Sequence, residues 1–557
     1  MIIDKSNLET AVDFADPYRR PDQTFPHLTL EMMERALAYG NELIAPDKMI
    51  LFERGQRASD FFIIREGKID ILESEEDGSF KVLTTHSAAQ FTGEMDLFNR
   101  RESLVTGRAK GECRLIRIDR TNFLRMMAGE ADMAELVMRA FMLRRLGFVR
   151  HAQGGIIILG KSRAADTLRL QRFLTRNYYP HHVVDIDDDP HGQELIETFH
   201  LLLSNAPVVI APGIAVMFNP TNSTLADALG LNEKFDPSEV FDVVVVGAGP
   251  SGLAAAVYAA SEGLNTLIIE RMAPGGQAGT SSRIENYLGF PTGISGQALA
   301  GRAQAQAQKF GARLSISRTA VTLDTALHPF SMLLDDAENV RAKSVIIATG
   351  ARYRKLDLPN YEKFEGGGIH YAATAMESKL CGSQEVVVVG GGNSAGQAAV
   401  FLSRAAKHVH IVVRGAGLAE TMSDYLVQRI INSPKITLWT HSKISALEGN
   451  SGLQSVSWTH GGDGSVETRE IQNLFVMIGA LPNTEWLSGS LELDDNGFVA
   501  TGMATGSGQA SMFNSSVPGV YAIGDVRSGS VKRVASGVGE GSVVVQSVHQ
   551  FLHNQVV

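Results

Sequence analysis

The stretch DVVVVGAGPSGLAAAVYAASEGLNTLIIE, at residues 242–270, constrains the fold more than any other feature of the chain. It reads as a buried strand, a glycine loop (Gly247-x-Gly249-x-x-Gly252), an Ala-rich helix and a second strand that ends in Glu270. In such a unit the glycines permit a tight turn, a close approach of the backbone to a pyrophosphate, and close packing of helix on strand. The helix N-terminus supplies amide donors for the phosphates, and the acid can accept a hydrogen bond from a ribose hydroxyl. The stretch therefore predicts a dinucleotide-binding βαβ unit.

A second loop of the same kind occurs in EVVVVGGGNSAGQAAVFLSRAAKHVHIVV, at residues 385–413. It reads Gly390-x-Gly392-x-x-Ala395, where alanine is small enough for the last position. Arg414 follows the next strand. An acid at this position would favour NAD, whereas an arginine favours NADP, because it can bind the 2′-phosphate. The residues predicted to bind NADPH or NADH are Gly390, Gly392, Asn393, Ser394, Ala395 and Arg414.

Further stretches around the two loops indicate that the first site binds FAD. They are GGQA at 275–278, ENYLGFP at 285–291, KSVIIATGA at 343–351 and VYAIGDV at 520–526. Asp525 follows directly after a predicted strand, where its carboxylate and the nearby amides could hold the ribityl chain or the phosphates. The predicted FAD-binding residues are Gly247, Gly249, Pro250, Ser251, Gly252, Glu270, Arg271, Gly276, Gln277, Asn286, Gly350, Gly524 and Asp525.

The order of these motifs over residues 241–555 resembles the low-molecular-weight thioredoxin reductases, including IGALPNT at 478–484 and the final helix from Ala535. The resemblance implies an FAD domain (241–358 and 482–557) interrupted by an NAD(P) domain (359–481). It implies an FAD-dependent NAD(P)H oxidoreductase that forms a homodimer. The predicted class is an α/β flavoprotein with two dinucleotide-binding domains, an N-terminal β-roll and a thioredoxin-like middle domain.

The redox Cys-x-x-Cys pair of that family falls here on Ala373 and Met376, so no catalytic residue is assigned. Neither side chain can perform thiol exchange, and Cys381, five residues further on, has no resolving partner nearby. The hydride step needs only proximity and orientation, so we expect electrons to leave for an unidentified acceptor outside the chain. Alternatives are a ferredoxin-type reductase, a flavin- or nucleotide-binding sensor or scaffold without turnover, and a disulfide reductase that uses Cys381. His370, just before the lost pair, is expected to be packed or solvated rather than catalytic.

Residues 151–235 alternate strands and helices in an order that resembles the thioredoxin fold. The turn that carries the redox cysteines of that fold reads Ser162-Arg163-Ala164-Ala165 here. Pro207 resembles the proline before the third strand, which is usually cis in that fold. We expect a thiol-free domain that serves dimerisation or docking.

Residues 1–150 show short alternating strands broken by glycine, with helical stretches predicted over 28–44 and 122–150. The block resembles cyclic nucleotide-binding domains, with FTGEMDLF at 91–98 in place of the phosphate-binding cassette. The resemblance makes Gly93 and Glu94 candidates for contacting a cyclic nucleotide, but the cassette arginine aligns with Ser103, which offers no charge to a phosphate. The arginines of the second helical stretch (Arg139, Arg144, Arg145, Arg150) are expected to form a solvated helix face.

Charge and composition limit the kinds of partner and the cellular location that we expect. The net charge of −10 disfavours nucleic acid. Two cysteines, no signal-peptide pattern and no long apolar run favour a cytoplasmic protein without a membrane span. No metal site is predicted.

Overall fold

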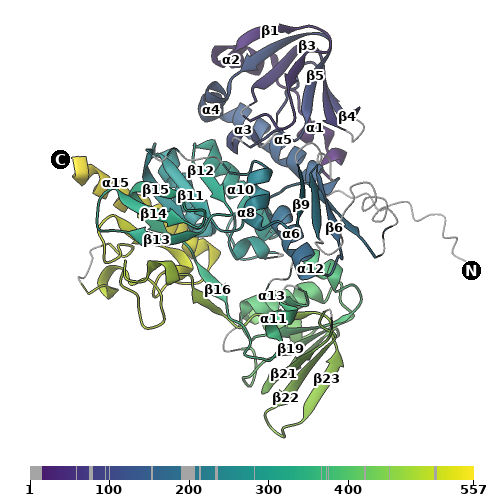
Figure 1. Cartoon of the computed structure of the whole chain (residues 1–557), viewed down its shortest axis with the longest axis vertical. Coiled ribbons are helices and arrows are strands. Elements are labelled where there is room, and N and C mark those ends of the chain that lie inside the picture. Colours follow the sequence, from purple (N-terminus) through teal and green to yellow (C-terminus); the bar gives the residue numbers. More distant parts are fainter. Residues whose placement is uncertain are drawn as a thin grey trace, which may run out of the picture.

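The computed structural model describes residues 16–57, 59–74, 79–93, 96–99, 101–151, 155–187, 189, 207–211, 215–232, 236, 238–281, 283–365, 367–371, 373, 375–419, 422–450, 452–506 and 511–556. Its sheets lie in separate units grouped around a central one (Figure 1). We call them the front domain (at the top), the middle domain (at the centre), the first nucleotide fold (at the left) and the second nucleotide fold (at the bottom). The described residues contain no helix that is long and apolar enough to cross a membrane.

The front domain is an antiparallel sheet with the strand order β1-β5-β3-β4, in which β2 also pairs with β5. The helix predicted over 28–44 is shorter than expected. Helix α2 (Leu30–Ala36) and a 3₁₀ turn (Leu37–Tyr39) end at the extended Gly40, and the next residues form a strand instead, because they pair along β5. The strands are β1 (Asn41–Ala45), β2 (Ile50–Phe52), β3 (Phe61–Ser74), β4 (Phe80–His86) and β5 (Thr106–Ile118).

Two helices close the front domain, α4 (Arg120–Gly129) and α5 (Ala131–Arg150). The prediction that the α5 arginines form a solvated face is wrong for two of them, because Arg144 and Arg145 are buried. Arg144 turns inward and donates hydrogen bonds to backbone carbonyls, and Arg145 pairs with Asp96 of α3 (Asp96–Asn99). Polar groups can be buried in this way only when hydrogen bonds compensate them.

The middle domain has the strand order β7-β6-β8-β9, with β6 and β7 parallel and the other pairs antiparallel. The strands and helices among the described residues follow one another along the chain as predicted for this segment. The elements are β6 (Ile156–Gly160), α6 (Ala165–Arg176), β7 (His181–Asp185), β8 (Val208–Ala211), β9 (Ala215–Phe218) and α8 (Asn222–Ala228). The predicted helix at 192–203 lies outside the described residues, and so does one partner of the peptide bond before Pro207.

The first nucleotide fold is a seven-stranded sheet with the order β12-β11-β10-β15-β14-β13, in which β26 pairs with β15. The pairs β10–β11, β10–β15, β11–β12 and β15–β26 are parallel, as a βαβ array requires, whereas β14 pairs antiparallel with both β13 and β15. Its strands are β10 (Val240–Val246), β11 (Thr266–Glu270), β12 (Arg313–Ile316), β13 (Ala320–Asp324), β14 (Phe330–Leu334), β15 (Asn339–Ile347) and β26 (Val520–Ala522). Helices α9 (Pro250–Ser261), α10 (Gly296–Lys309) and α15 (Val534–Val556) pack against it.

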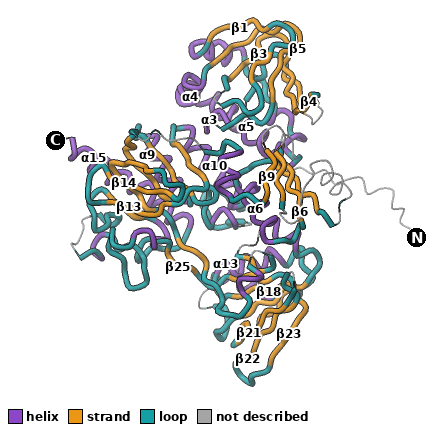
Figure 2. The backbone as a smooth tube through the Cα atoms, in the orientation of Figure 1, coloured by secondary structure: helices purple, strands orange, loops and turns teal. Residues whose placement is uncertain are grey.

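The second nucleotide fold is inserted between β15 and β26. Its parallel sheet has the order β17-β24-β18-β19-β20, and an antiparallel sheet, β21-β22-β23, adjoins it. Strands β16 (Ala351–Tyr353) and β25 (Ala480–Pro482) pair as a ribbon that joins the two nucleotide folds, as Figures 1 and 2 show. The other elements are α11 (Tyr361–Phe364), β17 (Ile369–His370), α12 (Ala375–Leu380), β18 (Glu385–Val389), α13 (Asn393–Leu402), β19 (His408–Val412), α14 (Asp424–Ile431), β20 (Ile436–Trp439), β21 (Ser442–Glu448), β22 (Ser455–His460), β23 (Val466–Glu470) and β24 (Leu474–Val476).

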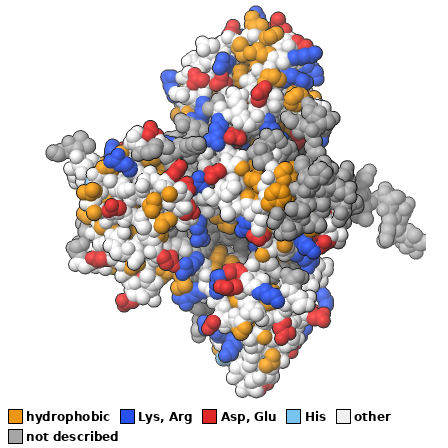
Figure 3. Space-filling model, viewed as in Figure 1, with side chains coloured by type: hydrophobic (Ala, Val, Ile, Leu, Met, Phe, Trp, Pro, Cys, Tyr) orange, Lys and Arg blue, Asp and Glu red, His pale blue; other side chains and the backbone are white. Residues whose placement is uncertain are grey.

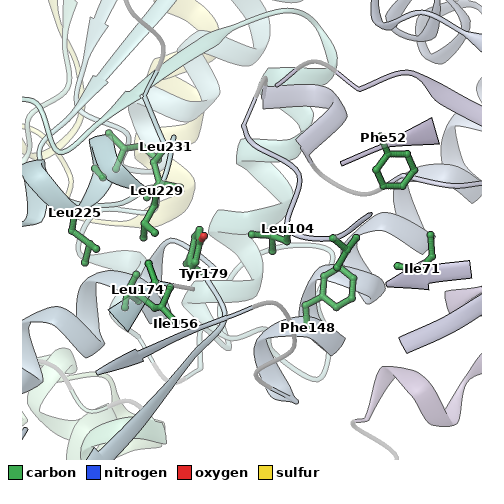
Figure 4. Packing of buried hydrophobic residues seen from close by; sticks show 14 of the residues in the cluster. Phe52, Ile71, Leu104, Phe148, Ile156, Leu174, Tyr179, Leu225, Leu229 and Leu231 are labelled. Atoms are coloured by element: carbon green, nitrogen blue, oxygen red, sulfur yellow. The ribbon is translucent and has the colours of Figure 1, made fainter. Parts of the chain in front are cut away.

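One hydrophobic cluster extends from the front domain into the middle domain (Figure 4). Phe52, Ile71 and Phe148 lie at one end of it, and Leu174 and Leu229 lie at the other. A shared apolar core costs free energy to separate, since burial is worth roughly 25 cal/mol per Å² of apolar surface. The front and middle domains therefore pack as one unit.

The face of the molecule in Figure 3 carries acidic and basic side chains in alternation rather than a continuous basic stripe. Binding to a nucleic-acid backbone needs clustered positive charge. This face is therefore not arranged for a phosphate backbone.

Candidate functional site

The first glycine loop has the geometry that its sequence predicts. Gly247 has a positive φ of 105°, and a Cβ atom there would lie 2.3 Å from the Ala348 carbonyl oxygen. A Cβ on Gly252 would lie 1.9 Å from the Gly247 oxygen, so glycine is needed for α9 to pack on the loop. At Gly249, by contrast, a Cβ would have only the Cα of Gly276 within 4 Å. The loop is closed on its protein side and open at Gly249, where a diphosphate would approach.

Glu270 anchors this loop at the end of β11. One carboxylate oxygen accepts the amide N–H of Ala248 at 2.7 Å, and the other accepts those of Met272 at 2.9 Å and Ala273 at 3.3 Å. A carboxylate offers about four lone-pair sites, so one remains for a ribose hydroxyl. The adjacent Arg271 is exposed to solvent.

The GGQA stretch lies directly against the mouth of α9. The Gly275 amide donates to the Ala248 carbonyl at 2.7 Å, and a Cβ on Gly276 would lie 3.0 Å from the Cα of Gly249. The Gln277 side chain donates to the Ala351 carbonyl, next to Gly350, which has a positive φ of 62°. Asn286 is exposed in the segment that follows. Gly276 therefore lies beside the opening at Gly249.

The C-terminal motif closes the other side of the site. A Cβ on Gly524 would lie 2.3 Å from Oγ of Ser251, the second residue of α9 after Pro250. The Gly524 amide donates to Glu540 at 2.6 Å, and Glu540 pairs with Arg527 at 2.7 Å. Burial raises the pKa of Asp525, which makes its carboxylate a group that benefits from a hydrogen-bond donor. Residues far apart in the sequence thus converge on the N-terminus of α9.

The second glycine loop repeats the arrangement. Gly390 has a φ of 133°, and a Cβ there would lie 2.2 Å from the Met477 oxygen. Gly392 is the N-cap of α13, Asn393 and Ser394 are exposed at its first turn, and Ala395 is buried beneath it. The exposed Arg414 follows β19 and the buried Val413. The helix N-terminus is open to an anionic ligand.

Comparisons with known proteins agree with this geometry. Residues 241–541 match the model of the pyridine nucleotide-disulphide oxidoreductase family, and residues 45–130 match that of the cyclic nucleotide-binding domain. The chain belongs to the pyridine nucleotide-disulphide oxidoreductase family. Its N-terminal unit is a cyclic nucleotide-binding domain.

Relatives place it among thioredoxin reductase-like oxidoreductases. The chain is 33% identical over 316 residues to the thioredoxin reductase of Chlamydia pneumoniae, which covers 56% of this chain and 98% of that protein. It is also 33% identical over 357 residues to the NADPH-dependent thioredoxin reductase 3 of Arabidopsis thaliana, which covers 61% of this chain and 65% of that protein. The structure of Lactococcus lactis thioredoxin reductase in its FR conformation covers 56% of this chain and 99% of that one, with 29% identity and a TM-score of 0.52.

In this oxidoreductase, the position of the family's cysteine pair lies just before and at the start of α12. Ala373 is buried, and Met376 is the second residue of α12. Cys381 is also buried, and burial raises the pKa of its thiol to about 12. A thiol must ionise to act as a nucleophile, so the environment of Cys381 opposes a redox role.

The middle domain covers the edge of the oxidoreductase beside that position. Its Arg163, in the turn where a thioredoxin would carry cysteines, donates to Gln472 at 2.5 Å. Arg172 of α6 lies 3.1 Å from Nδ1 of His370 and 3.4 Å from Glu377. His370, which is predicted to be packed or solvated rather than catalytic, is buried. No role was predicted for Arg163 or Arg172. Contacts across more than 190 positions leave no local signal in the sequence.

The cyclic nucleotide-binding domain of this oxidoreductase encloses a cavity of about 270 Å³. Gly93 and Ser103 line it, whereas Glu94 lies outside the described residues. The Ser103 hydroxyl donates to the Val105 carbonyl at 3.1 Å. Among the described lining residues, the one arginine or lysine is Arg144, which comes from α5 rather than from the cassette. It donates to the carbonyls of Thr24, Phe91 and Gly93.

Proposed function

We propose that the chain is an FAD-dependent NAD(P)H oxidoreductase that passes electrons to an acceptor outside the chain. One observation carries the proposal: the loop at Gly247–Gly252 is packed on its protein side and open at Gly249, at the N-terminus of α9. Ser251, Glu270, Gly276 and Gly524 surround that opening. Bound FAD would supply a flavin ring able to take a hydride from nicotinamide and pass its two electrons on.

In this proposal the first loop holds the diphosphate through the backbone at Gly249–Ser251. Glu270 binds the adenosine ribose through its remaining lone pair. The Asp525 carboxylate binds the ribityl hydroxyls, or the amides near it bind the diphosphate. The second loop, from Gly390 to Ala395, holds the diphosphate of NADPH or NADH. The exposed Arg414 favours NADPH, because a guanidinium can bind a 2′-phosphate with two hydrogen bonds. Arg271, which follows Glu270 and is exposed, would contact FAD from the rim. Asn286, also exposed, stays a predicted FAD contact.

The identity of Ala373 and Met376 supports an exit for electrons other than an intrinsic disulfide. The remaining cysteines, Cys113 and Cys381, are both buried. Acceptors that fit are a quinone, a ferredoxin, oxygen or an external disulfide.

The test is to mix the purified, FAD-loaded protein anaerobically with NADPH and, separately, with NADH. The proposal expects rapid loss of the oxidised flavin absorbance with at least one of them, and reoxidation when a competent acceptor is added. If the oxidised flavin absorbance persists with both nucleotides, the proposed oxidoreductase activity is contradicted and the second candidate function is supported.

That second candidate is a nucleotide or flavin sensor. It is favoured by the cavity of the front domain, since Phe52, Ile71 and Phe148 both line that cavity and belong to the cluster that continues into the middle domain (Figure 4). A cyclic nucleotide is the ligand that this domain's family suggests. Titration with cyclic AMP and cyclic GMP, followed by protein fluorescence, tests it, and no response to either contradicts it.

The homodimer, the cytoplasmic location and the domain boundaries at 150, 235, 358 and 481 stay predictions. Light scattering on the purified protein tests the dimer, and limited proteolysis tests the boundaries.

A further inference from the structure

Helix α6 of the middle domain lies between the two nucleotide folds (Figure 1). Arg163, just before the start of α6, and Arg172, in its C-terminal half, contact the second fold. At its C-terminus, the segment from Arg176 to Tyr178 contacts the first fold. This end of α6 therefore belongs to the surroundings of the proposed FAD site.

The last residue of α6, Arg176, reaches the rim of the first glycine loop. Its guanidinium donates to the Gly276 carbonyl at 2.9 Å and lies 3.1 Å from Sδ of Met272. Gly276 in turn packs against Gly249, since a Cβ on Gly276 would lie 3.0 Å from the Gly249 Cα. Only Gly276 therefore lies between the Arg176 guanidinium and Gly249, the residue at the opening before α9.

The charge of Arg176 has only neutral partners within hydrogen-bond distance among the described residues, a carbonyl and a thioether. Glu270, the acid with the largest electrostatic effect on Arg176, already accepts three amide hydrogen bonds. Burial lowers the pKa of Arg176, which reflects the cost of keeping a cation in this environment. A cation in a partly buried site without a carboxylate partner gains most from an anionic ligand.

We propose that Arg176 of the middle domain binds the FAD diphosphate and completes the cofactor site from outside the first nucleotide fold. The inference rests on the proposed FAD site at Gly249. FAD carries two negative charges on its diphosphate, which the loop amides and the α9 dipole meet from one side. Arg176 meets them from the side of Gly276. The thiol-free middle domain then has a chemical function, since FAD binds fully only while α6 is docked.

The matched variants separate charge from docking. Arg176→Gln removes the cation, and Arg176→Lys retains it. Tyr178→Phe removes a neighbouring hydrogen bond of the same docking segment, from the Tyr178 hydroxyl to the Gln297 carbonyl, without changing charge. Arg169→Gln removes an arginine of the same helix whose bonds stay within the middle domain, to Asp166, Asn219, Asn222 and Pro220.

The experiment measures the dissociation constant of FAD for the full-length apoprotein, by quenching of flavin fluorescence, at low and high salt. Arg176→Gln is expected to weaken binding roughly tenfold or more, since a charge-assisted hydrogen bond is lost. Its affinity should also depend less on salt than that of the wild type, because fewer charges are screened. Arg176→Lys should lie between the two, and Tyr178→Phe and Arg169→Gln should stay within about twofold of the wild type.

Two results overturn the inference while leaving the FAD site intact. One is that Arg176→Gln binds FAD as the wild type does. The other is that Tyr178→Phe weakens binding as much as Arg176→Gln does, which would make Arg176 a docking residue. If Arg176→Gln does not fold, Arg176→Lys takes its place. The inference is then overturned if Arg176→Lys, which keeps the positive charge, shows the roughly tenfold weaker binding and the reduced salt dependence expected for loss of that charge. A wild-type protein that binds no FAD would instead contradict the proposed function itself.

Discussion

Arg172 of the middle domain and His370 of the second nucleotide fold lie in hydrogen-bond contact, with 3.1 Å between the guanidinium and Nδ1 of the imidazole. Because arginine can only donate, Nδ1 must accept. The proton of the neutral ring then lies on Nε2, which is 3.0 Å from Oδ1 of Asn473 and donates to it. The contact fixes the tautomer of a buried histidine beside the position of the lost cysteine pair.

We predict that this contact helps to hold the middle domain on the oxidoreductase. Arg172→Met should lower the free energy of unfolding by about 2 kcal/mol, because Glu377, which is buried, loses a charged donor. Urea unfolding measures the change. In a double-mutant cycle with Glu377→Gln, the coupling energy should be about 1 kcal/mol or more. A coupling energy near zero would mean that the two side chains are neighbours without energetic consequence.

We predict a pH dependence of stability that originates at His370. Burial, with Arg172 beside it, lowers the pKa of His370 from 6.5 to about 4. Between these values the unfolded chain binds a proton that the folded chain does not, so stability falls as the pH falls from about 6.5 to about 4. The loss attributable to this residue is on the order of 3 kcal/mol.

Urea unfolding at several pH values checks this. His370→Gln should flatten the dependence over that window, whatever it does to stability at neutral pH. The exposed His182→Gln serves as the control and should leave the dependence unchanged. Equal slopes for the wild type and His370→Gln would contradict the prediction.

The two glycine loops could be predicted from the sequence because their determinants are local. Gly247 and Gly390 adopt backbone angles that other residues rarely take, and the strand before and the helix after each loop are contiguous with it. The succession of strands and helices along the middle domain was predicted on the same basis. The segment 41–45 was wrongly expected to be helical, because its pairing with β5 decides its structure and lies more than 60 positions away.

The docking of the middle domain could not be predicted. Nothing in the sequence distinguishes Arg172 and Arg176 from arginines on a solvent-exposed helix face. Their partners, His370 and Gly276, are 198 and 100 positions away. Arg144 was predicted to lie in solvent, but it is buried and lines the cavity of the front domain. Its partners are also distant in the sequence. Long-range contacts of charged side chains carry no periodic signal.

We predict that Gly249→Ala gives a folded protein that binds FAD poorly. The φ of Gly249 is −69°, which alanine adopts freely, and its Cβ would contact only the Gly276 Cα, at 4.0 Å. The added methyl group would instead occupy space needed by the diphosphate, and overpacking of this size weakens binding by roughly tenfold or more.

The measurements are the melting temperature of the apoprotein and the FAD dissociation constant. Gly417→Ala, at an exposed glycine with no atom within 4 Å of the added Cβ, is the control. If Gly249→Ala retains wild-type affinity for FAD, the diphosphate does not pass this glycine and the proposed site is misplaced.

We predict that Arg414 sets the preference between nicotinamide cofactors. Arg414→Ser should lower kcat/KM for NADPH by roughly tenfold, because the 2′-phosphate loses a charge-assisted bond. The value for NADH, which has no such phosphate, should change little. The exposed Arg404→Ser, beyond the far end of α13, removes the same charge without affecting the loop. If kcat/KM falls equally for NADPH and NADH, Arg414 contributes to binding of both nucleotides and does not discriminate between them.

We predict that Cys381 takes no part in electron transfer. Its thiol is buried, and burial together with Glu377 raises its pKa from 9.0 to about 12. At pH 8 the thiolate fraction is then about a thousandfold smaller than that of an ordinary cysteine. Cys381→Ala should therefore leave NAD(P)H-dependent reduction of menadione unchanged, and iodoacetamide should modify Cys381 in the wild type only after unfolding, as mass spectrometry of the peptides would show. Loss of reduction in Cys381→Ala, with FAD content and melting temperature preserved, would restore the disulfide-reductase hypothesis, because electrons would then need the one thiol that lies near the position of the lost pair.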